Sequence, residues 1–247
     1  MRPLLVVAFW LGVWQVVALA VGHQVLLASP ASVLVRLAQL VGTAELWAPV
    51  GHSLLRIGGG FVVGATLGTL LAVLAAAFRT VDALLTPLVG AVRSTPVVSV
   101  IILALIWADS SRLALLVSAT MVVPVVYANV AEGIGARDRR LLEMAAVFEV
   151  PRLRRLAAVD VPAVLPFFVA ACRIGVGLAW KSGVAAEVIG LPQGSIGERL
   201  YDAKILLSTA DLFAWTVVVV LLSHLLERLV LRLLALAGPA PVPVRSP

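Results

Sequence analysis

Residues 137–166 read RDRRLLEMAAVFEVPRLRRLAAVDVPAVLP and form the most charged stretch of the chain. Six of the 19 Lys and Arg residues lie in it, and strongly apolar segments flank it on both sides. Membrane proteins concentrate Arg and Lys in their cytoplasmic loops. The stretch is therefore predicted to be a cytoplasmic loop, and its mixture of charged and small residues favours a docking surface.

The composition of the whole chain indicates a membrane protein. Hydrophobic residues make up 62% of it, its mean hydropathy is +1.09, and only 13% of residues are charged, whereas soluble domains carry about 25% charged residues. A spanning helix needs about 20 mostly apolar residues, and several runs qualify, so we expect an all-α, multi-pass membrane protein. The net charge of +6 does not indicate a nucleic-acid partner, because cytoplasmic orientation and the anionic leaflet explain the arginine clusters.

Six apolar runs are predicted to span the membrane, and an even number puts both termini on one side. If that side is the cytoplasm, it holds the loop at 137–166 and most of the basic residues, as expected. The predicted spans are residues 4–21, 53–78, 83–107, 113–130, 163–189 and 212–236. Outside the loop, the cytoplasmic basic residues are Arg2, Arg79, Arg228, Arg232 and Arg245, and the external ones are Arg36, Arg112, Arg199 and Lys204.

Two features precede the second span. The first run resembles a secretory signal with a cleavage site at Ala18-Leu19-Ala20, but its length and its two tryptophans favour a retained first helix. Residues 26–42, LLASPASVLVRLAQLVG, have apolar residues at helical spacing. Ser29 or Ser32 is suited to cap a helix with Pro30 at its start. This helix is too short to span, so it is predicted to lie at the external interface.

The second and third spans carry features of helix packing. Gly60, Gly64, Gly68 and Ala72 recur every four residues, which predicts a ridge of small residues for close helix contact. The third span is interrupted at Ser94, Thr95 and Pro96, where proline removes a helix hydrogen bond and kinks the chain. Freed backbone groups at membrane depth need protein or water around them, so the kink is predicted to face the interior, either as a pathway wall or as a structural feature.

The fifth span carries charged residues that are costly within a membrane and usually face a cavity or a partner. Lys181 and Glu187 are six residues apart, which places them on different sides of a helix. One hypothesis is that Lys181, beside Trp180, lines a pathway for an anionic or carbonyl-bearing solute. The alternative is an ion pair of Lys181 with Asp109 or with a carboxylate of a second subunit. The single cysteine and three scattered histidines provide neither a disulfide nor a metal site.

The loop at 137–162 contains a pattern that resembles the "EAA" loop of ABC importer permeases. That family pattern runs Glu-x-Ala or Glu-Ala-Ala, three residues, Gly, nine residues, Ile-x-Leu-Pro. Asp138 is suited to cap its first helix, and Pro151 suits the first turn of a second helix. Glu149 replaces the family's Gly, whose positive φ costs little. The matching residues here are Glu143, Ala145, Ala146, Glu149, Val159, Val161 and Pro162.

The resemblance extends over nearly the whole chain to the nitrate/sulfonate/taurine-type permeases. The stretches LLEMAAVFEVPRLRRLAAVDVPAVLPFFVAACRIGVGLAWKSGVAAEVIG, RSTPVVSVIILALIWAD and LLERLVLRLL carry it. It implies a type I ABC importer permease fold with six transmembrane helices and a cytoplasmic coupling-helix loop. We therefore expect one permease domain over residues 1–247, with its core at 53–236 and its coupling loop at 137–162. The resemblance also gives Glu187 an architectural or gate-related role, because related permeases share its Ala-Ala-Glu.

The same resemblance implies partners. They are a second permease copy in a homodimer, two cytoplasmic ATPase subunits, and a periplasmic or lipid-anchored solute-binding protein. The chain contains no GxxxxGK[ST] motif, so ATP and Mg are expected on the partner ATPase, with no cofactor in this chain and no enzyme activity of its own. The implied location is the bacterial inner membrane, with both termini cytoplasmic.

Two other functions compete with the importer. An ion-coupled secondary transporter would need membrane-embedded carboxylates and often shows inverted repeats. No internal repeat is evident, and Glu187 is the one convincing acidic candidate in a span. A membrane enzyme would need a cluster of catalytic side chains near one interface, which the sequence lacks. The substrate is open among several small solutes, and Lys181 favours an anion.

Overall fold

The computed structural model describes residues 2–237 of the chain. Met1 and residues 238–247, which include Arg245, lie outside the described residues. Every regular element in the described part is helical. In chain order the elements are α1 (Arg2–Val21), α2 (Pro30–Val41), α3 (Ala44–Ala77), α4 (Arg79–Ser94), α5 (Val97–Ala104), α6 (Ser110–Gly135), α7 (Arg139–Val147), α8 (Arg152–Arg155), the π-helical η1 (Leu156–Asp160), α9 (Val161–Gly190), α10 (Ile196–Ile205) and α11 (Thr209–Ala237).

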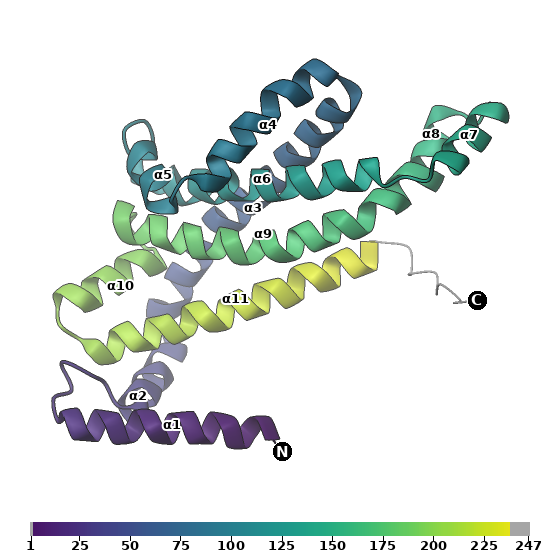
Figure 1. Ribbon diagram of the computed structural model, residues 1–247. Helices are drawn as coiled ribbons and strands as arrows, with labels where there is room; N and C mark the ends of the chain where they lie inside the picture. Colours follow the sequence, from purple (N-terminus) through teal and green to yellow (C-terminus); the bar gives the residue numbers. More distant parts are fainter. Residues whose placement is uncertain (1, 238–247) are drawn as a thin grey trace.

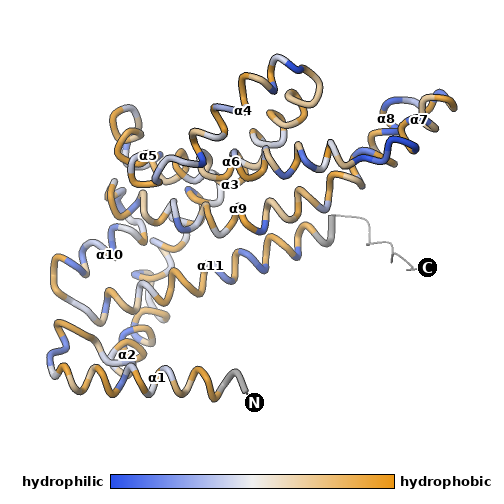
Figure 2. Tube along the Cα trace, viewed as in Figure 1, coloured by the Kyte–Doolittle hydropathy of each residue, from blue (hydrophilic) through white to orange (hydrophobic). Residues whose placement is uncertain are grey.

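The long helices run between two ends of the molecule. Figure 1 shows the start of α1, the turn between α3 and α4, the α7–α8 tip and the end of α11 toward one end. The α1–α2 and α10–α11 connections lie toward the other end. Hydrophobic residues predominate along the long helices, whereas hydrophilic ones gather near the α7–α8 tip (Figure 2). The start of α1 and the end of α11 thus lie toward the same end of the bundle.

Several of these helices are suited to cross a membrane. By length and composition, three qualify, namely α3, α6 and the continuous helical stretch Arg152–Gly190, and a fourth if α4 and α5 together form one broken span. In α1, Leu5–Val21 is a shorter apolar helix, and α11 has 29 residues. The all-α prediction is confirmed, and the total of six spans stays a prediction.

The third predicted span is not one kinked helix. It is two helices, α4 and α5, bent by 103° at the break. The predicted interruption at Ser94, Thr95 and Pro96 is thus present but is a full break between two helices, and a span over 83–107 stays a prediction. Proline disfavours the helical conformation in the residue before it, and Thr95 accordingly has φ −77° and ψ 128°. Nor does the break face the interior of this chain, because Ser94 and Pro96 are exposed and Thr95 is half-buried.

The small-residue ridge of α3 packs closely against α6, as predicted. A Cβ added at Gly64 would lie 2.8 Å from both the carbonyl oxygen of Ala119 and the Cβ of Val122. Gly60 and Gly68 meet the α6 backbone just as closely. The two helices therefore approach to a distance that only glycine permits. The core lies between α3, α6 and α9.

The predicted interfacial helix also forms where expected. The Ser29 side chain accepts a hydrogen bond from the backbone N–H of Ser32, and Pro30 is the first residue of α2. Arg36 of α2 forms ion pairs with Glu45 of α3 and Asp211 of α11. Its hydrogen bond to the Asp211 carboxylate raises the pKa of Arg36 above its ordinary value. These pairs fasten α2 to the end of the bundle opposite the α7–α8 tip.

Candidate functional site

The predicted coupling loop folds into a helical tip that projects beyond the bundle (Figure 1). Asp138 caps α7 as expected, with its carboxylate accepting a hydrogen bond of 2.8 Å from the backbone N–H of Arg140. Pro151 does not lie inside the second helix but immediately before it, as the N-cap residue of α8. After α8 the chain passes through η1 directly into α9, so the tip is continuous with a membrane helix.

The turn between α7 and α8 depends on a left-handed residue. Glu149 has φ +50°, the conformation for which the importer pattern uses glycine. The backbone N–H of Val150 then donates to the carbonyl oxygen of Ala145 at 2.9 Å, which closes the end of α7 as in common helix C-terminal motifs. Glu149 therefore keeps the left-handed conformation expected of the family's Gly, which costs roughly 1–2 kcal/mol for a residue with a Cβ.

The surface of the tip is apolar as well as charged. Val147, Phe148 and Leu153 are 79%, 74% and 82% exposed. Glu143 and Ala146 are also exposed, whereas Ala145 is buried in the tip. Large apolar side chains gathered on a surface mark interaction sites. The predicted residues Val159 and Pro162 lie at the base of the tip, half-buried and exposed respectively.

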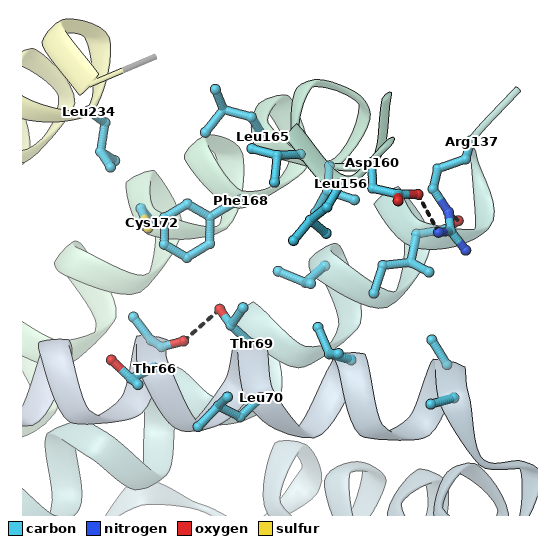
Figure 3. Close-up of a pocket in the computed structure, with 18 of the residues that line it drawn as sticks. Thr66, Thr69, Leu70, Arg137, Leu156, Asp160, Leu165, Phe168, Cys172 and Leu234 are labelled. Carbon is cyan, nitrogen blue, oxygen red and sulfur yellow. Dashed lines mark hydrogen bonds and ion pairs between the residues drawn. The ribbon is translucent and has the colours of Figure 1, made fainter. Parts of the chain in front are cut away.

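An ion-pair cluster that the sequence analysis did not identify joins the tip to the bundle. Arg137 donates from Nη1 to Oδ1 of Asp160 at 2.6 Å, and Arg155 donates from Nε to Oδ2 at 3.3 Å. Arg137 also donates to the carbonyl oxygen of Ile134 at the end of α6. The Asp160 side chain is only 10% exposed. Figure 3 shows Arg137 reaching the Asp160 carboxylate. The sequence did contain a signal for this cluster, because Asp160 is an acidic residue within the arginine-rich loop.

The predicted pathway residues lie in different environments. Lys181 is exposed on α9, and within the part of the chain that the structure describes it forms no ion pair with Asp109. The Asp109 alternative was therefore wrong, and a pathway role or a partner in a second subunit stays a prediction. Trp180 is buried, and its indole N–H donates to the carbonyl oxygen of Val219 in α11 at 3.0 Å. Trp180 does not line an open space in this conformation.

Glu187 lies in a buried polar network at the end of the bundle opposite the tip. It is fully buried, and its Oε2 accepts a hydrogen bond from the Ser53 hydroxyl at 2.7 Å. The Ser53 hydroxyl accepts the backbone N–H of Ile196 at 3.0 Å, and the backbone N–H of Gly197 lies 3.3 Å from Oε2. Glu187 thus connects α9 to α3 and to the start of α10. The role of Ser53 was not predicted, since nothing local in the sequence indicates a partner 134 residues away.

A bundle of long apolar helices with a charged and apolar projecting tip defines an all-helical, multi-pass membrane protein. Residues 64–236 match the family model described as "Binding-protein-dependent transport system inner membrane component". Because this match covers well over half of the chain, the chain belongs to that family. It is an ABC transporter permease, a transport component rather than an enzyme. This membership decides against the ion-coupled secondary transporter.

The relatives carry names of several solutes. The chain is 30% identical to the putative aliphatic sulfonates transport permease protein SsuC of Bacillus subtilis (strain 168), over 93% of this chain and 84% of the relative. It is 27% identical to the bicarbonate transport system permease protein CmpB of Synechococcus elongatus, over 72% and 64%. It is 28% identical to the riboflavin transport system permease protein RibX of Chloroflexus aurantiacus, over 89% and 85%.

The fold is also that of a solved importer. The structure titled "Crystal structure of an amino acid ABC transporter with histidines" aligns with a TM-score of 0.61 at 15% identity, covering 83% of this chain and 95% of that chain. At this identity the likeness concerns the fold alone. The predicted type I importer permease fold and the nitrate/sulfonate/taurine-type resemblance are confirmed.

Proposed function

We propose that two copies of this chain form the translocation pathway of an importer, with one ATPase subunit docked on each α7–α8 tip. The observation that carries this proposal is the tip itself. Val147, Phe148 and Leu153 are the most exposed large apolar side chains there, and the tip lies at the end of the bundle where the start of α1 and the end of α11 also lie. That end is the cytoplasmic one in this proposal, so both termini face the cytoplasm of the bacterial inner membrane.

The ATPase subunits supply the energy. ATP and Mg bind there, and closure of the two ATPases moves the tips. Because η1 continues into α9 and Arg137 connects the tip to α6, movement of the tip reaches both membrane helices. A periplasmic or lipid-anchored binding protein delivers the solute to the opposite end. A partner can drive such a cycle only if its contacts with the permease differ in strength between the two conformational states. The tip is the part of the chain placed to make such contacts with the ATPase.

The proposed cargo is a small anion. The support is Lys181, which is exposed on α9, because a charged side chain within a membrane span usually faces a cavity or pairs with a group of opposite charge. Two of the relatives are named for anions, aliphatic sulfonates and bicarbonate, and one for riboflavin. Uptake assays with the solute captured by the associated binding protein would identify the cargo.

Co-purification with the ATPase subunit of the same importer tests the docking tip. We expect wild type to retain the ATPase and the double variant Glu143→Arg with Ala146→Arg to lose it, because two bulky cations replace an acid and a small residue on the exposed face. The control is Asp202→Arg with Leu206→Arg, which changes two exposed positions near α10 at the other end of the bundle. Equal ATPase recovery from the tip variant and the control would show that the tip is not the docking surface.

A further inference from the structure

A long apolar crevice opens beside the tip, between α3, α9 and α11. Its volume is about 910 Å³, within the range of about 300–1,000 Å³ typical of small-molecule sites. Figure 3 shows Phe168 and Cys172 in its apolar part and Arg137 with Asp160 at its far end. The charged residues of the crevice therefore lie at one end.

The middle of the crevice provides few hydrogen-bonding groups for a polar solute. Thr66 and Thr69 are polar residues on its α3 wall, and both hydroxyls donate to carbonyl oxygens of their own helix at 2.8 Å. Most of the remaining wall consists of aliphatic and aromatic side chains. A small hydrated anion would lose its water there without gaining hydrogen bonds. A hydrocarbon chain would gain dispersion contacts instead.

The polar end carries a net positive charge. Two guanidinium groups, of Arg137 and Arg155, face the single carboxylate of Asp160. Each guanidinium has five N–H donors, and within the described residues Arg155 uses only its Nε toward Asp160. Its side chain is 44% exposed. The remaining donors are free for an anionic group at the mouth of the crevice.

We infer that the crevice binds an anionic phospholipid, with an acyl chain between α3 and α9 and its phosphate at Arg155. Basic pockets between membrane helices on the cytoplasmic side bind anionic headgroups. The inference rests on the proposed orientation, which places Arg155 at the cytoplasmic leaflet. The bound lipid would lie against the base of the tip, so it would influence how the tip moves relative to α3.

Photo-crosslinking from position 66 tests this inference without requiring transport. The full chain carries p-benzoylphenylalanine in place of Thr66 and is reconstituted in vesicles with equal amounts of phosphatidylglycerol and phosphatidylcholine. After irradiation, intact mass identifies the adduct. We expect phosphatidylglycerol adducts to exceed phosphatidylcholine adducts by about fivefold, the effect of one basic residue near the headgroup. The same probe at Thr216, an exposed α11 position outside the crevice, should show no preference.

Charge variants show whether Arg155 provides the preference. In Arg155→Gln the adducts should persist and the preference for phosphatidylglycerol should be lost, whereas Arg155→Lys and the neighbouring Arg154→Gln should keep it. A large excess of inorganic phosphate should not reduce the adducts, because the acyl chain is part of the ligand. A covalent dimer from position 66, equal yields of the two lipids, a preference unchanged in Arg155→Gln, or displacement by phosphate would each overturn the inference.

Discussion

Arg137 and Asp160 form an ion pair across the base of the α7–α8 tip, with Nη1 of Arg137 2.6 Å from Oδ1 of Asp160. The residues follow α6 and precede α9, so the pair closes the loop that carries α7 and α8. The Asp160 carboxylate is nearly buried and also accepts from Arg155. The pair therefore holds the tip in one orientation relative to both membrane helices.

Asp160→Asn should destabilise the protein. The substitution leaves two guanidinium groups without their carboxylate, and charged hydrogen bonds contribute about 1.5–3 kcal/mol each. We expect a lower unfolding midpoint in detergent and weaker retention of the ATPase. Asp202→Asn is the matched control, because Asp202 is exposed on α10. Equal unfolding midpoints for the two variants would show that the Arg137 pair contributes nothing to stability.

Ser53→Ala should loosen the end of the bundle opposite the tip. The hydroxyl donates to Glu187 and accepts from the Ile196 N–H, so its loss leaves the buried Ile196 N–H without a partner and Glu187 Oε2 with only the 3.3 Å bond from Gly197, at about 1–3 kcal/mol. Hydrogen exchange at the start of α10 should accelerate. Ser182→Ala is the control, since this equally buried hydroxyl bonds only carbonyls of its own helix. If both variants exchange alike, the network is not what holds α10.

Gly64→Ala should separate α3 from α6. The new methyl group would lie 2.8 Å from the Ala119 carbonyl oxygen, and such overpacking costs roughly 1–3 kcal/mol. Gly58→Ala on the same helix is the control, because a Cβ there meets nothing within 4 Å. That change should be neutral or stabilising by up to about 1 kcal/mol. Thermal unfolding of the two variants gives the comparison, and a stable Gly64→Ala protein would contradict the close packing.

Glu149→Gly should relieve strain in the tip. The left-handed backbone at Glu149 costs a residue with a Cβ roughly 1–2 kcal/mol, and glycine recovers part of it. We expect an unfolding midpoint at or above that of wild type, with ATPase binding preserved. In the control Glu143→Gly, glycine enters the interior of α7 and should destabilise by about 1 kcal/mol. The opposite order of the two midpoints would refute the strained turn.

Lys181→Met should lower uptake while leaving folding intact if Lys181 lines the pathway. A charged hydrogen bond to an anionic solute contributes at least about 1.5 kcal/mol, or about tenfold in uptake at limiting solute. Lys204→Met, at an exposed α10 position, controls for the loss of one positive charge. Unchanged transport by a correctly folded Lys181→Met protein would eliminate the pathway role.

Local features of the chain were predictable because they depend on neighbours in sequence. The caps at Ser29 and Asp138 act within three residues, and the glycine ridge of α3 follows from the helical repeat. The unusual turn was identifiable because Glu149 occupies the position where the importer pattern has glycine. Hydropathy and the basic loop were enough to predict an all-helical membrane protein with a charged projecting tip.

What the sequence by itself determined, then, was the all-helical class, most of the long apolar helices and the place of the tip, since backbone hydrogen bonding in a membrane allows little else. Only the tertiary structure decided which distant side chains meet. Ser53 donates a hydrogen bond to Glu187, which lies 134 residues away in the sequence. Of the six arginines in the loop, the Asp160 carboxylate pairs with Arg137 and Arg155. The 103° bend at Pro96 is a further example. A proline determines where a helix ends, whereas packing against α6 and α9 determines the direction of α5.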